Sequence, residues 1–554
     1  MSSLSDSQLA QLDNLIYYIS NDPRVSEQLT GNPSVEQIVR VSMDRVDTFG
    51  EEVSPDLPAM MSEKEWHTMF DAIAADKTLC SYTIQNYEND SNPKSNTYNF
   101  CAAAFVSEDS SDVNVIFRGT NGDLPEWIDN GAGGYSTETI YQQKALSYIN
   151  GLPFDGDVTV SGHSKGGNLS MYTAIMSDRV GRCVAIDGQG FSEEFAREYT
   201  ARIGMNRDKI TLISARWDFV NPLLYTIAGK CQFIKTGFPM PPFIGFHKPN
   251  ILLDKNGNLR TEGSSSSLTD IVQSLSTFVN SCIEDPKRQE LIDYLTSLLA
   301  NDMKPSEEEL EEMKEAAFDG IAPYIPMYLM WVKAKRAADS QLEKFSDEHD
   351  FETEEAIKKY LREHTGNEYP EYLVRGALLR CRHGSHARRL NLLKDHAVYV
   401  RGCPMIHEFN CETADERNIS WFGVCKSPCP PTTDLICLKK DPPRDASGNP
   451  VGEAGGTVDG RKCEPFIVSY QWKDTYPKTR IIDNGDLNPR DRAAAEADGS
   501  GQGEASVTTL SFLVCNWGGL IEPYTSGQEL AEQEAEGDQG DCDNSSQSSD
   551  AHSH

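Results

Sequence analysis

The chain has 554 residues, of which 25% are charged and 38% are hydrophobic, and its formal net charge is −34 at pH 7. A single hydrophobic core rarely grows beyond about 250–300 residues, so this length predicts at least two folded units. The negative charge argues against sequence-independent binding to nucleic acid, which depends on Lys and Arg side chains that neutralise phosphates.

The N-terminal segment lacks the basic region and the apolar run of a secretory signal. The most apolar stretch, residues 323–332, has only about half the length that a transmembrane helix requires. We therefore expect a protein that is made in the cytoplasm and has no transmembrane segment. If it leaves the cell, it uses a route other than a signal peptide.

The first 250 residues alternate strand-like and helix-like patterns, which is typical of α/β architecture. Helix-like segments separate apolar runs of strand length at residues 98–106, 114–117, 158–160, 183–186 and 210–213. Polar residues follow several of these runs directly, where doubly wound sheets place their functional groups. The pattern predicts a doubly wound sheet with a site at its strand ends.

One serine lies on a turn between a strand and a helix, in the segment Gly162-His163-Ser164-Lys165-Gly166. A nucleophile on such a turn needs small residues on both sides, because the turn is strained and the helix packs close to the strand. This segment predicts an α/β-hydrolase fold with Ser164 as the nucleophile.

The oxyanion of acyl transfer needs two backbone N–H donors. Lys165 supplies one, directly after the nucleophile, and we expect Thr120 to supply the other from the loop after an earlier strand. His247 is the only histidine between Ser164 and the following helical region, so it is the expected general base.

Two acids, Asp187 and Asp218, each follow an apolar strand and compete for the role of orienting His247. In α/β-hydrolases the acid usually follows the later strand, closer in sequence to the histidine. We therefore expect Asp218 to hold the imidazole tautomer. Asp187 would then shape the turn or the pocket.

Several of these motifs resemble known families. Residues 117–120, 162–167 and 218–220 are similar to the lipase class 3 pattern, and residues 126–130, 164–169 and 187–191 resemble a bacterial lipase-like α/β-hydrolase family, the Mbeg-like group. The resemblance covers roughly residues 10–280 and implies an esterase or lipase that acts on acyl esters, including glycerolipids or phospholipids. Lys165 departs from the usual Leu, and we hypothesise that its charge favours an anionic head group.

Residues 281–368 are helix-like and include an acidic run at 306–312, which is typical of a solvated helical linker or cap. Within them, residues 324–332 could instead form a lipid-facing lid. From residue 369 onward, short β-type runs and cysteines predict a small β-rich module that extends to residue 528. Residues 529–554 lack Lys and Arg and are rich in acids and Ser, which predicts a disordered acidic tail. The first 280 residues form the hydrolase domain in this division.

In the β-rich module, residues 372–381, 418–425, 463–465 and 510–521 resemble the PAAR-like domain family. That resemblance implies a small cone at the tip of a contractile injection spike.

Nine of the 14 cysteines lie between Cys381 and Cys542. Two groups have a spacing similar to that of metal ligands, namely Cys381-x-His383-x2-His386 and Cys403-x3-His407-x3-Cys411. A structural zinc ion is one interpretation of this pattern, since a small module gains folding energy from a metal. Buried thiols or disulfides with surface histidines are the other. The hydrolase itself is expected to require no cofactor.

Together these features predict a serine esterase or lipase that is delivered as an effector on a contractile injection spike. The expected partners are a lipid or acyl-ester substrate, a spike-tip protein and an immunity protein, with no nucleic acid. Two alternatives stay open. The chain could be a cytoplasmic housekeeping esterase with an accessory β domain, or a structural spike-tip protein whose hydrolase fold has lost activity.

Overall fold

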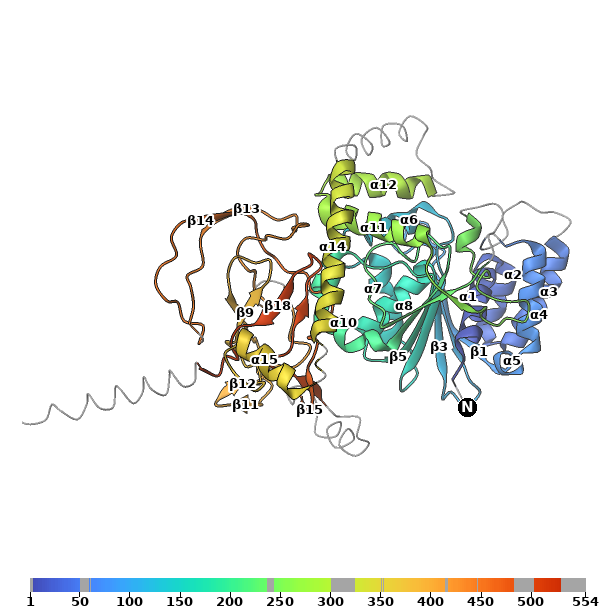
Figure 1. Ribbon diagram of the computed structural model, residues 1–554. Helices are drawn as coiled ribbons and strands as arrows, with labels where there is room; N and C mark the ends of the chain where they lie inside the picture. The colour runs from blue at the N-terminus through green and yellow to red at the C-terminus, as the bar shows by residue number, and fades with distance from the viewer. Residues whose placement is uncertain are drawn as a thin grey trace, which may run out of the picture. The chain divides into compact units, whose positions relative to one another are not determined.

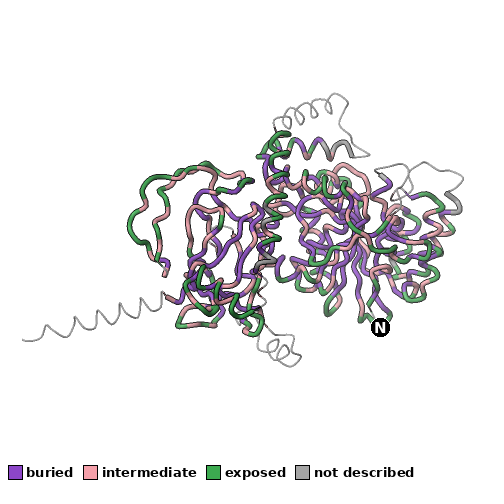
Figure 2. Tube along the Cα trace, in the orientation of Figure 1, coloured by how far each residue is buried: buried purple, intermediate pink, exposed green. Residues whose placement is uncertain are grey.

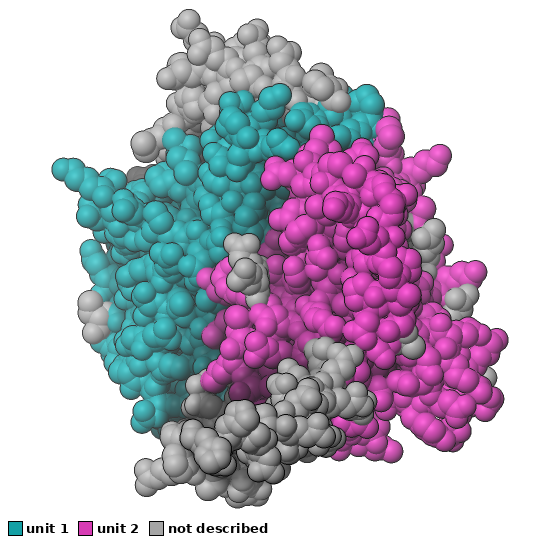
Figure 3. Space-filling model, turned by 90° about the vertical axis from the view of Figure 1, so that its left-hand side faces the viewer, with its two compact units in different colours: residues 1–196, 205–328 teal, residues 197–204, 329–554 magenta. Residues whose placement is uncertain are grey.

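The computed structural model describes residues 3–49, 59, 61–236, 244–299, 324–349, 351, 353–413, 417–445, 447–482 and 503–529. The chain divides into two compact units (Figure 3). The first comprises residues 1–196 and 205–328, and the second comprises residues 197–204 and 329–554. The finer four-part division at residues 280, 368 and 528 stays a prediction. The acidic run at 306–312 and the predicted tail beyond Glu529 lie outside the described residues.

The sheet of the first unit contains eight strands that are hydrogen-bonded in chain order: β1 (Thr83–Asn89), β2 (Cys101–Val106), β3 (Val113–Phe117), β4 (Val158–His163), β5 (Val180–Ile186), β6 (Ile210–Ala215), β7 (Lys230–Ile234) and β8 (Glu262–Gly263). Neighbouring strands from β3 to β7 run parallel. The pairs β1–β2, β2–β3 and β7–β8 run antiparallel. This large mixed sheet confirms the predicted α/β fold class (Figure 1).

The helices of the first unit precede the sheet, lie between its strands or follow it: α1 (Asp6–Asn21), α2 (Pro23–Ser26), α3 (Val35–Phe49), α4 (Glu63–Ala75), α5 (Lys77–Ser81), α6 (Leu124–Ala132), α7 (Ile140–Asn150), α8 (Lys165–Met176), α9 (Glu193–Glu198), α11 (Ser267–Cys282) and α12 (Lys287–Leu299). Helix α1 begins with a capping box in which the side chains of Ser5 and Gln8 each bond the other residue's backbone N–H. Its Tyr18 packs edge-on against Trp66 and Phe70 of α4. These contacts hold the N-terminal helices together before the sheet begins.

Alternation along β4 shows how helices cover both faces of the sheet. The Ser161 hydroxyl donates a 2.9 Å hydrogen bond to Asp13 on α1. The next residue, Gly162, faces the opposite way, where an added Cβ would stand 2.4 Å from the carbonyl carbon of Gly166 in α8. Helices α1 and α8 therefore lie on opposite faces. The eight strands follow one another across the sheet in chain order, without a reversal. The face opposite α8 is therefore covered by α1, an N-terminal helix that precedes all eight strands.

The described part of the second unit combines most of α10 (Thr200–Asn206) and of α14 (Ile325–His349) and all of α15 (Glu354–His364) with ten short strands: β9 (Leu378–Cys381), β10 (Arg388–Arg389), β11 (Tyr399–Val400), β12 (Cys403–Pro404), β13 (Leu435–Lys439), β14 (Thr457–Arg461), β15 (Tyr476–Ile481), β16 (Glu504–Ser506), β17 (Leu513–Val514) and β18 (Leu520–Pro523). Four of them form an antiparallel sheet in the order β10-β9-β18-β17, and the others pair as β11–β12, β13–β14 and β15–β16. The unit is β-rich, as the sequence predicts. Its buried side chains gather around the β9–β18 pair, whereas no residue of β13 or β14 is buried (Figure 2).

The apolar stretch at residues 324–332 begins α14. Leu329 and Met330 are exposed, whereas Trp331 is buried. In the part of the chain that the structure describes, no helix is long and apolar enough to cross a membrane.

Candidate active site

Ser164 occupies a strained turn between β4 and α8. Its backbone angles are φ 60° and ψ −123°, a conformation that residues with a side chain rarely adopt. The turn is held from both sides, because the Ser164 N–H donates to the Ile186 carbonyl on β5 and its own carbonyl accepts from the N–H of Asn168 in α8. This geometry places the Ser164 side chain at the end of β4, on the turn that leads into α8.

The structure brings Ser164 together with His247 and Asp218. The Oγ atom of Ser164 lies 2.7 Å from Nε2 of His247, and Nδ1 of His247 lies 2.7 Å from Oδ1 of Asp218. This arrangement assigns the ring proton to Nδ1, so that Nε2 is free to accept the hydroxyl proton. The three side chains thus form one continuous hydrogen-bonded chain.

Asp218 is fully buried after β6, and its second oxygen is also occupied. Oδ2 accepts hydrogen bonds from the backbone N–H of Val220 (3.2 Å) and from both the backbone N–H and the side-chain amide of Asn221 (2.8 and 2.9 Å). These donors fix the carboxylate so that Oδ1 faces the imidazole.

The rival acid, Asp187, is bonded elsewhere. Its Oδ1 accepts from the backbone N–H of Ala215 (2.7 Å) and from the side chain of Asn221 (3.3 Å). Burial raises the pKa of Asp187 well above its ordinary value, and the nearby Asp218 carboxylate raises it further. Both effects favour the neutral form of the Asp187 carboxyl, whose hydrogen bonds tie the end of β5 to the end of β6.

His163, which the sequence did not single out, lies against His247. Its ring centroid is 4.7 Å from that of His247, and its Nδ1 is 3.0 Å from the hydroxyl of Tyr17. Burial lowers the pKa of His163 well below its ordinary value, and the neighbouring His247 lowers it further. A neutral ring here adds no positive charge that would oppose protonation of His247.

His163, Asp187 and His247 also place one potential metal-ligand atom each within 4.8 Å of the others. Both ring nitrogens of His247, however, already lie in the bonds to Asp218 and Ser164. The donor set therefore fits the hydrogen-bonded chain better than a metal ion, and we assign it to the chain.

The loop that carries Thr120 is braced by α6. Arg118 and Glu126 form a fully buried ion pair (3.3 Å), and the Glu126 carboxylate also accepts from the backbone N–H of Asn121 (2.8 Å). The Thr120 hydroxyl accepts a 2.9 Å hydrogen bond from the side chain of Asn130. This bracing fixes the backbone on both sides of Thr120.

Lys165 begins α8, and its side chain does not face a substrate. Its ammonium donates to Asp129 Oδ2 (2.7 Å), Asn130 Oδ1 (3.0 Å) and the Glu126 carbonyl (3.2 Å), and it lies 4.1 Å from the centre of the Tyr141 ring. The charge is neutralised inside the protein. The structure therefore does not support selection of an anionic head group by this side chain, and Lys165 instead locks α6 to the turn.

Two family models match the chain. The model described as Mbeg1-like matches residues 73–297, in agreement with the Mbeg-like resemblance, and the model described as Domain of unknown function (DUF4280) matches residues 373–494. Each covers less than half of the chain. None of the curated proteins matches.

Among solved structures, the Lip2 lipase from Yarrowia lipolytica is similar at 14% identity, with 50% of this chain and 90% of that chain covered and a TM-score of 0.25. The M37 lipase is similar at 11% identity, with 59% and 94% covered and a TM-score of 0.26. At these TM-scores neither structure carries an argument. The fold assignment rests on the strand order and on the turn at Ser164.

The Lys165–Asp129 pair generates a stability prediction. Because both side chains are largely buried, removing one partner strands the other, and we expect Lys165→Met to lower the free energy of unfolding by about 3 kcal/mol. Asp129→Asn should lower the free energy of unfolding less in the Lys165→Met variant than in the wild type. Denaturant titrations of the two single variants and the double variant measure this coupling. If the double variant loses as much free energy of unfolding as the two single variants together, the pairing is contradicted.

A second prediction concerns the neutral Asp187. The folded state keeps a proton that the unfolded chain releases above a pKa of about 3.9, so this group lowers stability as the pH rises above that value. Asp187→Asn cannot titrate and should be more stable than the wild type at pH 8, with a flatter profile between about pH 5 and pH 8. Thermal unfolding across this range tests it, with Asp71→Asn on the exposed side of α4 as the control. Parallel profiles for wild type and Asp187→Asn would refute the neutral state.

Proposed function

We propose that the first unit is a serine hydrolase of carboxylic esters, with Ser164 as nucleophile, His247 as general base and Asp218 as the residue that orients His247. The observation that carries the proposal is the pair of 2.7 Å contacts that link the three side chains at a strained strand-to-helix turn. The Mbeg1-like family match over residues 73–297 supports it.

In the proposed reaction, Oγ of Ser164 attacks the ester carbonyl while Nε2 of His247 takes the hydroxyl proton. The buried Asp218 carboxylate stabilises the imidazolium that forms. The backbone N–H groups of Lys165 and Thr120 are the proposed donors to the oxyanion, and Lys165 has the added advantage of the positive end of α8. His247 then returns the proton to the leaving alcohol, and water hydrolyses the acyl-enzyme by the same steps.

Aromatic side chains near His247 favour an acyl substrate. Phe219 lies with its ring centroid 5.9 Å from that of His247, and Phe246, the residue before His247, lies 6.4 Å from Trp217. Such a wall suits an acyl chain, which gains free energy on leaving water. We propose lipid esters, including glycerolipids or phospholipids, as the substrate class.

We further propose that the second unit delivers the enzyme as a PAAR-like tip of a contractile injection spike, with a spike-tip protein and an immunity protein as partners. The support is the order of its four short motifs and the DUF4280 match over residues 373–494. The housekeeping-esterase alternative needs no such module.

Hydrolysis is tested with the purified chain on phospholipid vesicles, triglycerides and short acyl esters. Ser164→Ala and Asp218→Asn should each lower kcat by about 10⁴-fold. Asp187→Asn should retain most of the activity, because that side chain does not contact His247 in the hydrogen-bonded chain. Ser147→Ala on α7 is the matched serine control, and a fluorophosphonate probe should label the wild type but not Ser164→Ala. Equal rates for the wild type and Ser164→Ala would refute the mechanism.

Delivery is tested in producing cells by deleting the sheath gene of their contractile system. The chain should then no longer reach neighbouring cells, although its level in the producer is unchanged. Transfer that persists without the sheath would refute this route.

A further inference from the structure

One side of helix α1 carries polar side chains that are buried. Tyr17 follows Asp13 by four residues and Asn14 by three, so the three side chains lie on one side of the helix. Each of them is at most 3% exposed. Burying polar groups costs free energy unless they are hydrogen-bonded. The partners of Asn14 and Tyr17 therefore show what this side of α1 holds in place.

Tyr17 reaches the residue that precedes the nucleophile. Its hydroxyl lies 3.0 Å from Nδ1 of His163, and the two rings meet edge-on with their centroids 5.9 Å apart. His163 is itself buried, and its ring packs against that of His247 with a centroid distance of 4.7 Å. A ring that is hydrogen-bonded at one nitrogen and packed against its neighbours is held in one orientation. Tyr17 therefore fixes the surface against which His247 rests.

The same hydroxyl borders the loop that leads to Thr120. A Cβ added to Gly119 would stand 2.0 Å from the Tyr17 hydroxyl oxygen and 2.5 Å from the His163 carbonyl oxygen. Glycine at this position lets the backbone of the loop approach the hydroxyl closely. Tyr17 thus lies beside both the segment before the nucleophile and the segment before the proposed oxyanion donor.

The residues directly after His247 are anchored to N-terminal helices as well. The side-chain amide of Asn14 on α1 donates to the Pro249 carbonyl (3.2 Å). The ammonium of Lys248 donates to both carboxylate oxygens of Glu65 on α4 (3.0 and 3.1 Å). The loop of His247 is therefore held at its backbone by α1 and at its side chains by α4.

These anchors come from a part of the chain that the Mbeg1-like match does not cover. The match begins at residue 73, whereas α1 spans Asp6–Asn21 and Glu65 lies in the first turn of α4. Ser164 and His247 lie within the match. A role for α1 in the site is therefore a property of this structure that the family match does not supply.

We propose that Tyr17 is a positioning residue of the hydrolase, which acts through His163 to hold the imidazole of His247 within reach of Ser164. This role rests on the proposed function, because it concerns the geometry of that reaction. Tyr17 is buried on the α1 side of the sheet, so it acts through its neighbours and not on the substrate. Proton transfer requires Nε2 of His247 to stay within hydrogen-bond reach of Oγ of Ser164, 2.7 Å in this structure. Without the Tyr17 hydroxyl, the ring of His163 can turn and His247 can shift.

Tyr17→Phe removes only the hydroxyl and keeps the ring in the core. We expect kcat for the ester that the wild type hydrolyses best to fall by about 10- to 100-fold with KM unchanged, because a small misplacement of a catalytic group has an effect of this order. The rate at which a small fluorophosphonate labels Ser164 should fall by the same factor. That rate reports on the nucleophile and its base without an ester substrate.

A double-mutant cycle distinguishes positioning from a merely structural role. His163→Phe keeps a ring against His247 but cannot hydrogen-bond to Tyr17. If Tyr17 acts through His163, adding Tyr17→Phe to His163→Phe should leave the labelling rate unchanged. A general weakening of the core would instead lower the rate by the same factor in both backgrounds and would overturn the proposal.

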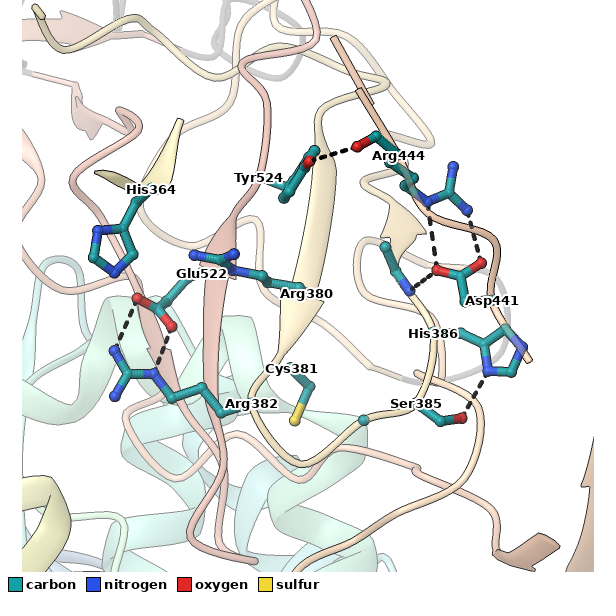
Figure 4. Close-up of a pocket in the computed structure, with 12 residues that line it drawn as sticks. His364, Arg380, Cys381, Arg382, Ser385, His386, Asp441, Arg444, Glu522 and Tyr524 are labelled. Carbon is teal, nitrogen blue, oxygen red and sulfur yellow. Dashed lines mark hydrogen bonds and ion pairs between the residues drawn. The ribbon is translucent and has the colours of Figure 1, made fainter. Parts of the chain in front are cut away.

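Two other tyrosines provide matched controls. Tyr18, the next residue of α1, is buried, and its hydroxyl donates to the Ser42 carbonyl (3.4 Å). Tyr524 lines a cavity of about 650 Å³ in the second unit, where its hydroxyl donates to the carbonyls of Arg444 (3.4 Å) and Asp445 (3.0 Å) (Figure 4). Tyr18→Phe and Tyr524→Phe each lose a bonded hydroxyl away from the site, and both should keep the wild-type kcat and labelling rate.

Failure of this role can be told apart from failure of the proposed function. A wild type that the fluorophosphonate does not label at Ser164 would refute the nucleophile, and the role of Tyr17 with it. Wild-type rates of labelling and hydrolysis in a folded Tyr17→Phe would overturn the positioning role alone and leave the hydrolase in place. If Tyr17→Phe does not fold, His163→Phe decides, because wild-type rates in that variant would remove the path through which Tyr17 acts.

Discussion

The first unit is organised around a backbone conformation that is unfavourable in itself. Ser164 is held at φ 60°, which costs of the order of 1–3 kcal/mol and persists only where neighbouring structure enforces it. The enforcement comes from β5, which accepts the Ser164 N–H, and from β3, since the position of a Cβ on Gly166 is 2.0 Å from the Phe117 carbonyl oxygen. Strands and helix pack so closely here that a relaxed turn would separate α8 from the sheet.

Burial at these strand ends also determines which ionisable side chains near the site are charged. Asp218 and Asp187 both end buried strands, yet only Asp218 has three donors on one oxygen and an imidazole on the other. Asp187 has donors on only one of its oxygens, and its raised pKa favours the protonated form. The site therefore combines one fixed carboxylate with an acid and a second histidine whose shifted pKa values favour their neutral forms, and the single proton that moves in the proposed reaction is that of Ser164.

Much of this site follows from the sequence, because strand ends converge at one edge of a sheet and the nucleophile, acid and base follow a fixed chain order. The residues that the sequence missed act through tertiary neighbours. His163 precedes the nucleophile, but its contact with His247 depends on an η4 turn (Ile244–His247) more than 80 residues later. The expectation for Lys165 failed for a similar reason: its position beside the nucleophile was evident, whereas its Asp129 partner on α6 was not.

The second unit shows the same limit in another form. Local spacing can relate Cys403 to His407 and Cys411, which are close in the chain, but it cannot relate Cys381 to Cys515, which lie on strands paired to opposite sides of β18. The first unit is stabilised by an eight-stranded sheet with helices on both faces, so it can bear the strain at Ser164. The second unit has strands of two to six residues, and its buried side chains form a core around the β9–β18 pair.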